Sequence, residues 1–159
     1  MRILGVDPGS HVTGYGIVEL LERGMASPDY GEIRFSGGSA LERCLPQVYD
    51  RLMEVVLREK PDAMAVEDIF YGKNVKSLIK QGHVRGAVIL AGCHSGIPVY
   101  PYTPLEVKKA VVGYGRAEKF QVQKMVQAIL KLPELPPADA SDALAVAICH
   151  AHTRRGSMP

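Results

Sequence analysis

The chain has 159 residues, of which 47% are hydrophobic and 23% charged, and its formal net charge is +2. This length suits one domain with one core, and the absence of any apolar run of about 18 residues predicts no transmembrane helix. Because the net charge is so small, it neither requires nor excludes a nucleic-acid partner, and the distribution of the charges has to decide.

The first part of the chain has the pattern of three short strands. Apolar runs over residues 2–7, 13–20 and 30–35 are separated by short turns. Such short connections predict an antiparallel meander. Asp7 is expected at the end of the first strand, where "PGS" stops it.

Helices and strands then alternate. Helical periodicity covers residues 39–60, with Ser39 as the expected N-cap and Pro46 expected to kink or break the first turn. The later elements are a strand over 63–68, a helix over 75–96, a strand over 97–102, and helices over 104–113, over 117–132 and from Pro137 onward. The crossover helix between the fourth and fifth strands requires parallel pairing there. The sequence therefore predicts an α/β fold, with a mixed five-stranded sheet and helices on both faces.

We expect one domain over residues 1–159, in which about 153–159 form a flexible tail. The cysteines Cys44, Cys93 and Cys149 are widely spaced, so they predict small buried residues and neither a disulfide framework nor a metal site. The N-terminus "MRILGVDPGS" lacks the apolar stretch of a signal peptide. These features predict a protein of the reducing cytoplasm.

Four acidic residues fall at strand ends and at a helix start. Asp7 ends the first strand, Glu67 ends the fourth, and Asp139 and Asp142 stand one turn apart where the apolar helix of "LPPADASDALAVAICHAH" begins. If the first and fourth strands are parallel neighbours, all four carboxylates meet at one edge of the sheet. Taken singly, Asp139 could simply cap its helix and Asp7 could simply start a turn.

A cluster of four carboxylates needs compensation. Two unit charges roughly 4 Å apart repel by about 4 kcal/mol at an effective dielectric of about 20, so the cluster must take up protons or bind cations. Oxygen ligands favour Mg²⁺ or Mn²⁺ over zinc, and two divalent ions would balance four carboxylates. Paired divalent ions are a device for displacement at phosphorus.

Four segments of this chain resemble the RuvC family of Holliday junction resolvases: "GVDPGSHVTGYG", "AVEDIFYGKN", "VVGYGRAEKFQVQKMV" and "ADASDALAVAICH". The match extends from residue 2 to about 152 in the order and spacing of the family. The resemblance implies an RNase H-like fold and a homodimer formed around the helix that holds Gly82, Gly86 and Ala87. It also implies Mg²⁺-dependent nicking of two symmetric strands at a four-way DNA junction, and contacts with the branch-migration proteins RuvA and RuvB.

The catalytic, metal-binding acids of the family fall on Asp7, Glu67, Asp139 and Asp142. With them we expect two Mg²⁺ per subunit, which Mn²⁺ can replace, and a two-metal mechanism.

Aromatic and basic residues flank these acids in the sequence. Phe70 lies in "FYGKN" and either folds onto the core or stacks on bases at the junction. Charges on a helix are usually only solvated, but a basic rim around an acidic metal site suits a polyanion held for hydrolysis. The predicted DNA-binding residues are Phe70, Lys76, Lys80, Lys108, Arg116 and Lys119.

The predicted function is a structure-selective endonuclease of DNA recombination and repair, which nicks two strands of like polarity and leaves ligatable 5′-phosphate nicks. Three alternatives stay open. A nuclease of the same fold could act on RNA or RNA–DNA hybrids. A non-enzymatic junction-binding module would gain nothing from four acids near phosphate. An actin-like ATPase would also use "GVDPGS", but no second phosphate loop follows it.

Overall fold

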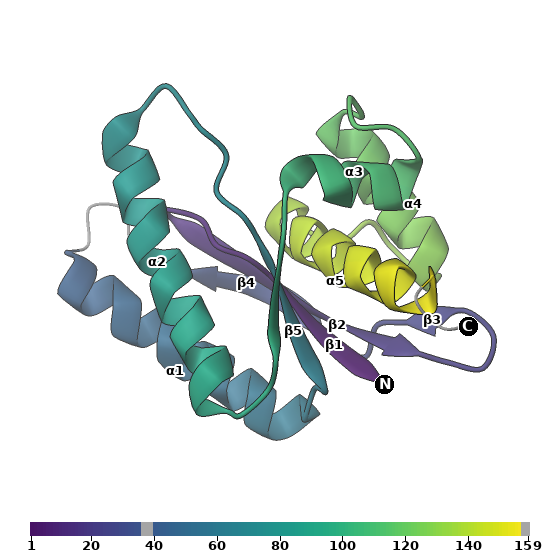
Figure 1. Cartoon of the computed structure of the whole chain (residues 1–159), viewed down its shortest axis with the longest axis horizontal. Helices are drawn as coiled ribbons and strands as arrows, with labels where there is room; N and C mark the ends of the chain where they lie inside the picture. Colours follow the sequence, from purple (N-terminus) through teal and green to yellow (C-terminus); the bar gives the residue numbers. More distant parts are fainter. Residues whose placement is uncertain (36–39, 157–159) are drawn as a thin grey trace.

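The computed structural model describes residues 1–35 and 40–156, and it places one sheet between two layers of helices (Figure 1). Within those ranges the sheet consists of six strands: β1 (Arg2–Asp7), β2 (Val12–Leu20), β3 (Met25–Ala26), β4 (Tyr30–Arg34), β5 (Ala63–Glu67) and β6 (Val99–Tyr102). The helices in the same ranges are α1 (Leu41–Glu59), α2 (Val75–His94), α3 (Pro104–Val112), α4 (Lys119–Leu130) and α5 (Ala138–Gly156).

The sheet is mixed, as predicted. Its order is β3-β2-β1-β5-β6, and β4 also pairs with β2. The pairs β1–β2 and β2–β4 are antiparallel, whereas β1–β5 and β5–β6 are parallel. The strand that the sequence did not predict is β3, whose two residues pair with the end of β2 beside β4. Pro28 lies between β3 and β4 and has no N–H for the ladder, so one edge of the sheet is interrupted there.

Alternate residues of the strands supply two separate cores. Leu4, Val6 and Ile17 point to the face covered by α1 and α2, whereas Ile3 and Val18 point to the face covered by α5, α3 and α4 (Figure 1). Each fully buried aliphatic side chain of this kind stabilises the fold by about 1.5–3 kcal/mol. Helices therefore cover both faces of the sheet, as the sequence predicted.

The helix α5 packs directly on the sheet because glycines face it. A Cβ on Gly14 would lie 1.9 Å from the carbonyl oxygen of Asp139, and a Cβ on Gly5 would lie 2.0 Å from that of Ala143. A Cβ on Gly16 would lie 2.4 Å from Leu144 Cδ2. Real Cβ atoms essentially never come closer than 3.0 Å to another atom, so only glycine permits this approach. The first turns of α5 consequently lie against β1 and β2.

Three local predictions need correction or comment. The helix α1 continues through Pro46 from Leu41 to Glu59, so its first turn is not broken there. Its N-cap is Ala40, and the predicted cap Ser39 lies outside the described residues. The predicted tail is helical as far as Gly156, because nothing in "HTRR" terminates a helix. The rest of that prediction, residues 157–159, lies outside the described residues.

Cys44 and Cys149 are buried as predicted, but Cys93 is exposed on α2. Among the described residues, no helix is both long enough and apolar enough to cross a membrane.

Replacing Gly14 with Ala should destabilise the protein by about 3 kcal/mol, because the added methyl overlaps the main chain of α5 and forces it away from the sheet. The free energy of unfolding from urea titrations measures this loss. Gly82→Ala is the matched control, since its Cβ meets its nearest neighbour, Ile69 Cδ1, at an ordinary 3.6 Å. The control should be unchanged or more stable by about 0.5–1 kcal/mol. Equal stability of the two variants would contradict the close packing of α5.

Candidate functional site

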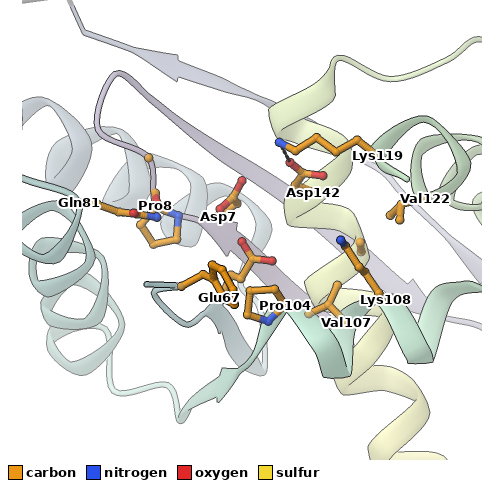
Figure 2. A pocket seen from close by; sticks show the side chains of 13 residues that line it. Asp7, Pro8, Glu67, Gln81, Pro104, Val107, Lys108, Lys119, Val122 and Asp142 are labelled. Atoms are coloured by element: carbon orange, nitrogen blue, oxygen red, sulfur yellow. Dashed lines mark hydrogen bonds and ion pairs between the residues drawn. The ribbon is translucent and has the colours of Figure 1, made fainter. Parts of the chain in front are cut away.

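Two of the predicted acids leave the sheet side by side. The parallel register pairs Val6 of β1 with Val66 of β5, so the residues that follow, Asp7 and Glu67, emerge at the same edge. Both side chains line the same cleft, and burial together with the charge of Asp7 raises the pKa of Glu67. Figure 2 shows both side chains reaching into one cleft. The sequence made their meeting conditional on these two strands being parallel neighbours, and the structure meets that condition.

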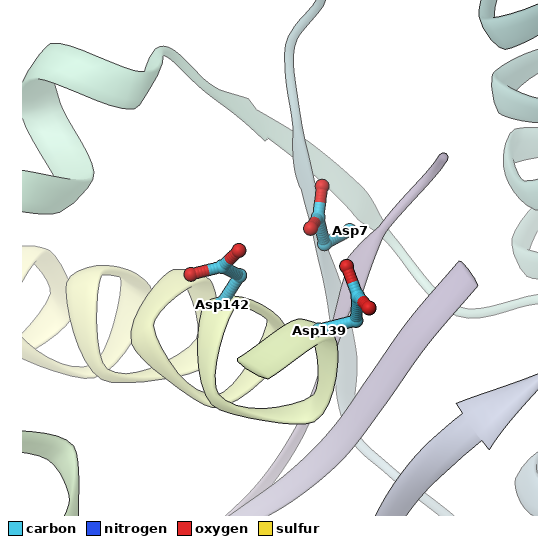
Figure 3. Close-up of side chains that lie close together, drawn as sticks. All are labelled: Asp7, Asp139 and Asp142. Carbon is cyan, nitrogen blue, oxygen red and sulfur yellow. The ribbon is translucent and has the colours of Figure 1, made fainter. Parts of the chain in front are cut away.

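The first turns of α5 bring the other two acids to the same place. Asp7, Asp139 and Asp142 each have a carboxylate oxygen within 4.8 Å of the other two (Figure 3). The carbonyl of Pro137 accepts a hydrogen bond of 2.8 Å from the N–H of Ser141. This bond closes the first helical turn, and Asp139 lies within that turn. Three of the four predicted acids thus present oxygen ligands that could hold a cation, and the fourth, Glu67, lines the same cleft as Asp7 and Asp142.

Burial dominates the electrostatics of these groups. It is the largest cause that raises the pKa of Asp7 to about 6, and the charges of Asp142 and Asp139 act in the same direction. Burial, followed by the charge of Asp7, raises the pKa of Glu67 to about 9. Burial also raises the pKa of Asp139 and of Asp142. Without a cation, Glu67 therefore retains at neutral pH a proton that a free carboxyl group would have released.

A lysine lies at the mouth of the cluster. Lys119 begins α4, and its Nζ is 3.4 Å from Asp142 Oδ2, as Figure 2 shows. The charge of Asp142 raises the pKa of Lys119, which stays protonated. Because the lysine side chain is 82% exposed, the pair adds little to stability. The ion pair places the positive charge of the lysine side chain next to the acidic cluster.

The cleft above the acids has a volume of about 410 Å³. Lys108 of α3 and Lys119 lie on one side, and Gln81 of α2 lies on the other, where its Nε2 donates a 2.9 Å hydrogen bond to the carbonyl of Pro8. Phe70 also lines the cleft although it is 73% exposed, so it does not fold onto the core. This finding excludes the first of the two alternatives for Phe70, packing on the core, and leaves stacking on bases as a prediction.

The remaining predicted DNA-binding residues lie elsewhere. Lys76 and Lys80 line a second hollow of about 490 Å³, together with His11. Ser10, which lines this hollow, directly follows Gly9, which lines the cleft, so the two hollows lie next to each other along this turn. Arg116 is exposed between α3 and α4 and lines neither hollow. Of the predicted DNA-binding residues, the structure therefore groups Phe70, Lys108 and Lys119 with the acids.

Glu32 of β4 also belongs to this neighbourhood, and sequence reasoning missed it. Its Oε1 accepts a hydrogen bond of 3.3 Å from the main-chain N–H of Asp139. The alternation of Ile33 and Phe35 toward the α1–α2 core would have placed Glu32 on the opposite face, where a charge is unusual. A charge on that face becomes informative only when the strand that pairs with β4 is known, and the sequence alone does not identify that strand.

Known proteins resemble this chain over nearly all of its length. A family model described as crossover junction endodeoxyribonuclease RuvC matches residues 3–150. A curated protein of the same description from Geobacter metallireducens is 50% identical over 153 residues, which cover 96% of this chain and 93% of the relative. One from Desulforamulus reducens is 49% identical over 152 residues, with 95% and 93% covered.

Among solved structures, T. thermophilus RuvC in complex with Holliday junction substrate superposes with a TM-score of 0.91 at 35% sequence identity, and the match covers 99% of this chain and 97% of that one. A second T. thermophilus RuvC structure gives a TM-score of 0.89 at 34% identity, with 99% and 98% covered.

In the absence of divalent metal, the free energy of unfolding should fall as the pH rises from about 4 to about 9. The pKa of Asp7 is about 6 and that of Glu67 about 9 in the folded protein, above their ordinary values of 3.8 and 4.5, so in this window the folded state holds protons that the unfolded state has released. Raising the pH then favours unfolding, by at most about 1.4 kcal/mol per pH unit for each proton retained.

Urea titrations in EDTA at several pH values measure this slope. Glu67→Gln cannot take up the proton and should show a shallower dependence on pH. A slope as steep as that of the wild type would mean that Glu67 does not hold the proton.

Proposed function

Because the chain belongs to the RuvC family of crossover junction endodeoxyribonucleases and has its RNase H-like fold, we propose that it resolves four-way DNA junctions by hydrolysing phosphodiester bonds. The observation that carries this proposal is the convergence of Asp7, Asp139 and Asp142 within 4.8 Å below a cleft with a basic rim. A protein that only bound DNA would gain nothing from acids placed against phosphate. The whole chain acts as one nuclease domain in this proposal.

The donor set fits hard divalent cations. The atoms that converge are carboxylate oxygens, and Glu67 lines the same cleft as Asp7 and Asp142. Such ligands suit Mg²⁺, or Mn²⁺ in its place, and not the sulfur and nitrogen preferences of zinc. We propose that the four acids hold two Mg²⁺ per subunit. When bound, these ions would polarise the scissile phosphate and lower the pKa of a water molecule.

The basic residues hold the substrate in this proposal. Lys108 and Lys119 project into the cleft from α3 and α4, so they meet the phosphate oxygens beside the bond to be cut. Lys76 and Lys80 line the adjoining hollow and would follow the strand beyond that bond, while the exposed Arg116 contacts the backbone farther out. The positive rim reduces the repulsion between an acidic site and a polyanion.

Phe70 engages the bases in this proposal. It lies on the border of the cleft, and 73% of its surface is exposed. An aromatic ring in water has no stabilising role in the isolated fold, but it can stack on a base exposed where strands exchange. Such stacking contributes about 1–3 kcal/mol per base.

Two copies of the chain would place two such sites on one junction. A hollow of about 450 Å³ between α1 and α2 is mostly apolar, and its lining residues include Leu45, Pro46, Tyr49, Gly86, Ala87 and Leu90. We propose that a second copy covers this surface. The two-fold dimer then nicks two strands of like polarity and leaves 5′-phosphate ends that a ligase can join. RuvA and RuvB complete the proposed set of partners.

Asp7→Asn should abolish Mg²⁺-dependent paired nicking of a synthetic four-way junction, with activity at least about 100-fold lower, while binding is retained or strengthened. The reason is that the change removes a cation ligand and also a negative charge near the DNA phosphates. Gel assays of cleavage and of binding measure the two effects separately. EDTA should abolish nicking by the wild type.

A linear duplex and an RNA–DNA hybrid are the control substrates. Preferential cutting of the hybrid, or undiminished nicking of the junction by Asp7→Asn, would contradict the proposed function.

Phe70→Ala should reduce junction cleavage by about tenfold or more without unfolding the protein, because one stacking contact is lost while the ring makes little contribution to the core. Single-turnover cleavage rates and circular dichroism measure the two quantities. Tyr71→Ala is the matched control, since Tyr71 is 91% exposed but does not line the cleft. If both variants cleave at the rate of the wild type, Phe70 does not contact the bases.

A further inference from the structure

Glu32 lies in the same row of the sheet as the acids of the site. The register pairs Asp7 of β1 with Gly14 of β2, and Gly14 in turn with Glu32 of β4. Residues paired in this way point to the same face of a sheet, which here is the face covered by α5. Asp7 and Glu32 are two strands apart, about 10 Å. Gly14 leaves the space between them open.

The first turn of α5 fills that space. The carbonyl oxygen of Asp139 lies 1.9 Å from the position that a Cβ on Gly14 would take. Glu32 therefore flanks Asp139 on one side, and Asp7 lies within 4.8 Å of its carboxylate on the other. Any shift of this turn along the sheet would change the distance between Asp139 and Asp7.

The contacts of Glu32 fix this turn. Its side chain is only 11% exposed, and its Oε1 accepts the hydrogen bond of 3.3 Å from Asp139 N–H. That N–H belongs to the second residue of α5 and has no acceptor within the helix. The negative charge also complements the positive end of the helix dipole. An ion pair with Arg34 balances the charge of Glu32 on the outer side.

We propose that Glu32 is a positioning residue, which holds the main chain of Asp139 so that its carboxylate can join Asp7 and Asp142 around a divalent cation. The inference rests on the proposed function only in that these aspartates bind the cation. Glu32 contacts Arg34 and the main chain of α5, and after burial its charge also raises the pKa of the Asp139 carboxyl group. Groups that orient metal ligands in this way commonly alter metal affinity by about 10–100-fold.

The test measures the affinity of Mn²⁺ for the DNA-free protein by isothermal titration calorimetry. Glu32→Ala and Glu32→Met both remove the acceptor for Asp139 N–H, and the second keeps the side-chain volume. Glu32→Gln keeps an oxygen acceptor but loses the charge. Glu19→Gln is the matched control, because Glu19 is paired with Arg2 at the opposite end of β2. Unfolding in EDTA reports the fold of each variant.

Glu32→Ala and Glu32→Met should weaken Mn²⁺ binding by about tenfold or more, Glu32→Gln by about threefold or less, and Glu19→Gln should have no effect. Wild-type affinity in the first two variants would overturn the proposal. A loss in Glu32→Gln equal to that in Glu32→Ala would also overturn it, because charge alone would then explain the effect. If Glu32→Ala does not fold, Glu32→Met decides, and failure of both to fold would assign Glu32 to the fold instead.

Junction cleavage does not enter this measurement. A wild-type protein that binds Mn²⁺ but cuts no junction would refute the proposed function and leave the result for Glu32 intact. A wild-type protein that binds no Mn²⁺ would overturn both.

Discussion

The close contact between α5 and the strands β1 and β2 is the constraint on which the site depends. Three glycines remove the side chains that would otherwise separate helix from sheet, so the main chain of α5 rests against the strands at Gly5 and Gly14. A normal layer of side chains keeps helices and sheets about 10 Å apart. At that spacing the short side chains of Asp139 and Asp142 would not reach Asp7. The carboxylates can approach one another because these strands have no side chains at Gly5, Gly14 and Gly16.

The same contact makes the acids costly to the fold. Burial raises the pKa of every carboxyl group in the cluster, which means that the folded protein resists carrying their charges. The large apolar core beneath α5 stabilises the arrangement in spite of this. A divalent cation would relieve the repulsion, so the features that oppose charge in the free protein are those that favour cation binding. Stability and function act in opposite directions at this site.

Much of this organisation could be predicted from the sequence, because it depends on local patterns. The apolar runs predicted that Asp7 and Glu67 end their strands, and the start of the last helix supplied Asp139 and Asp142. The parallel pairing of β1 with β5, which brings Asp7 and Glu67 together, came from the structure. What escaped prediction depends on pairing between distant segments. The two residues of β3 are too few to show periodicity. The role of Glu32 depends on its register with Gly14, and the exposure of Phe70 depends on a loop without repeating pattern.

The site joins the two ends of the chain, since Asp7 lies in the first strand and Asp139 and Asp142 lie in the last helix. During synthesis on the ribosome, the first strand emerges long before Asp139 and Asp142 have been added. A nascent or prematurely terminated polypeptide can therefore contain Asp7 and Glu67 but neither of the two acids of α5. Translation itself thus delays assembly of the acidic cluster until the chain is almost complete.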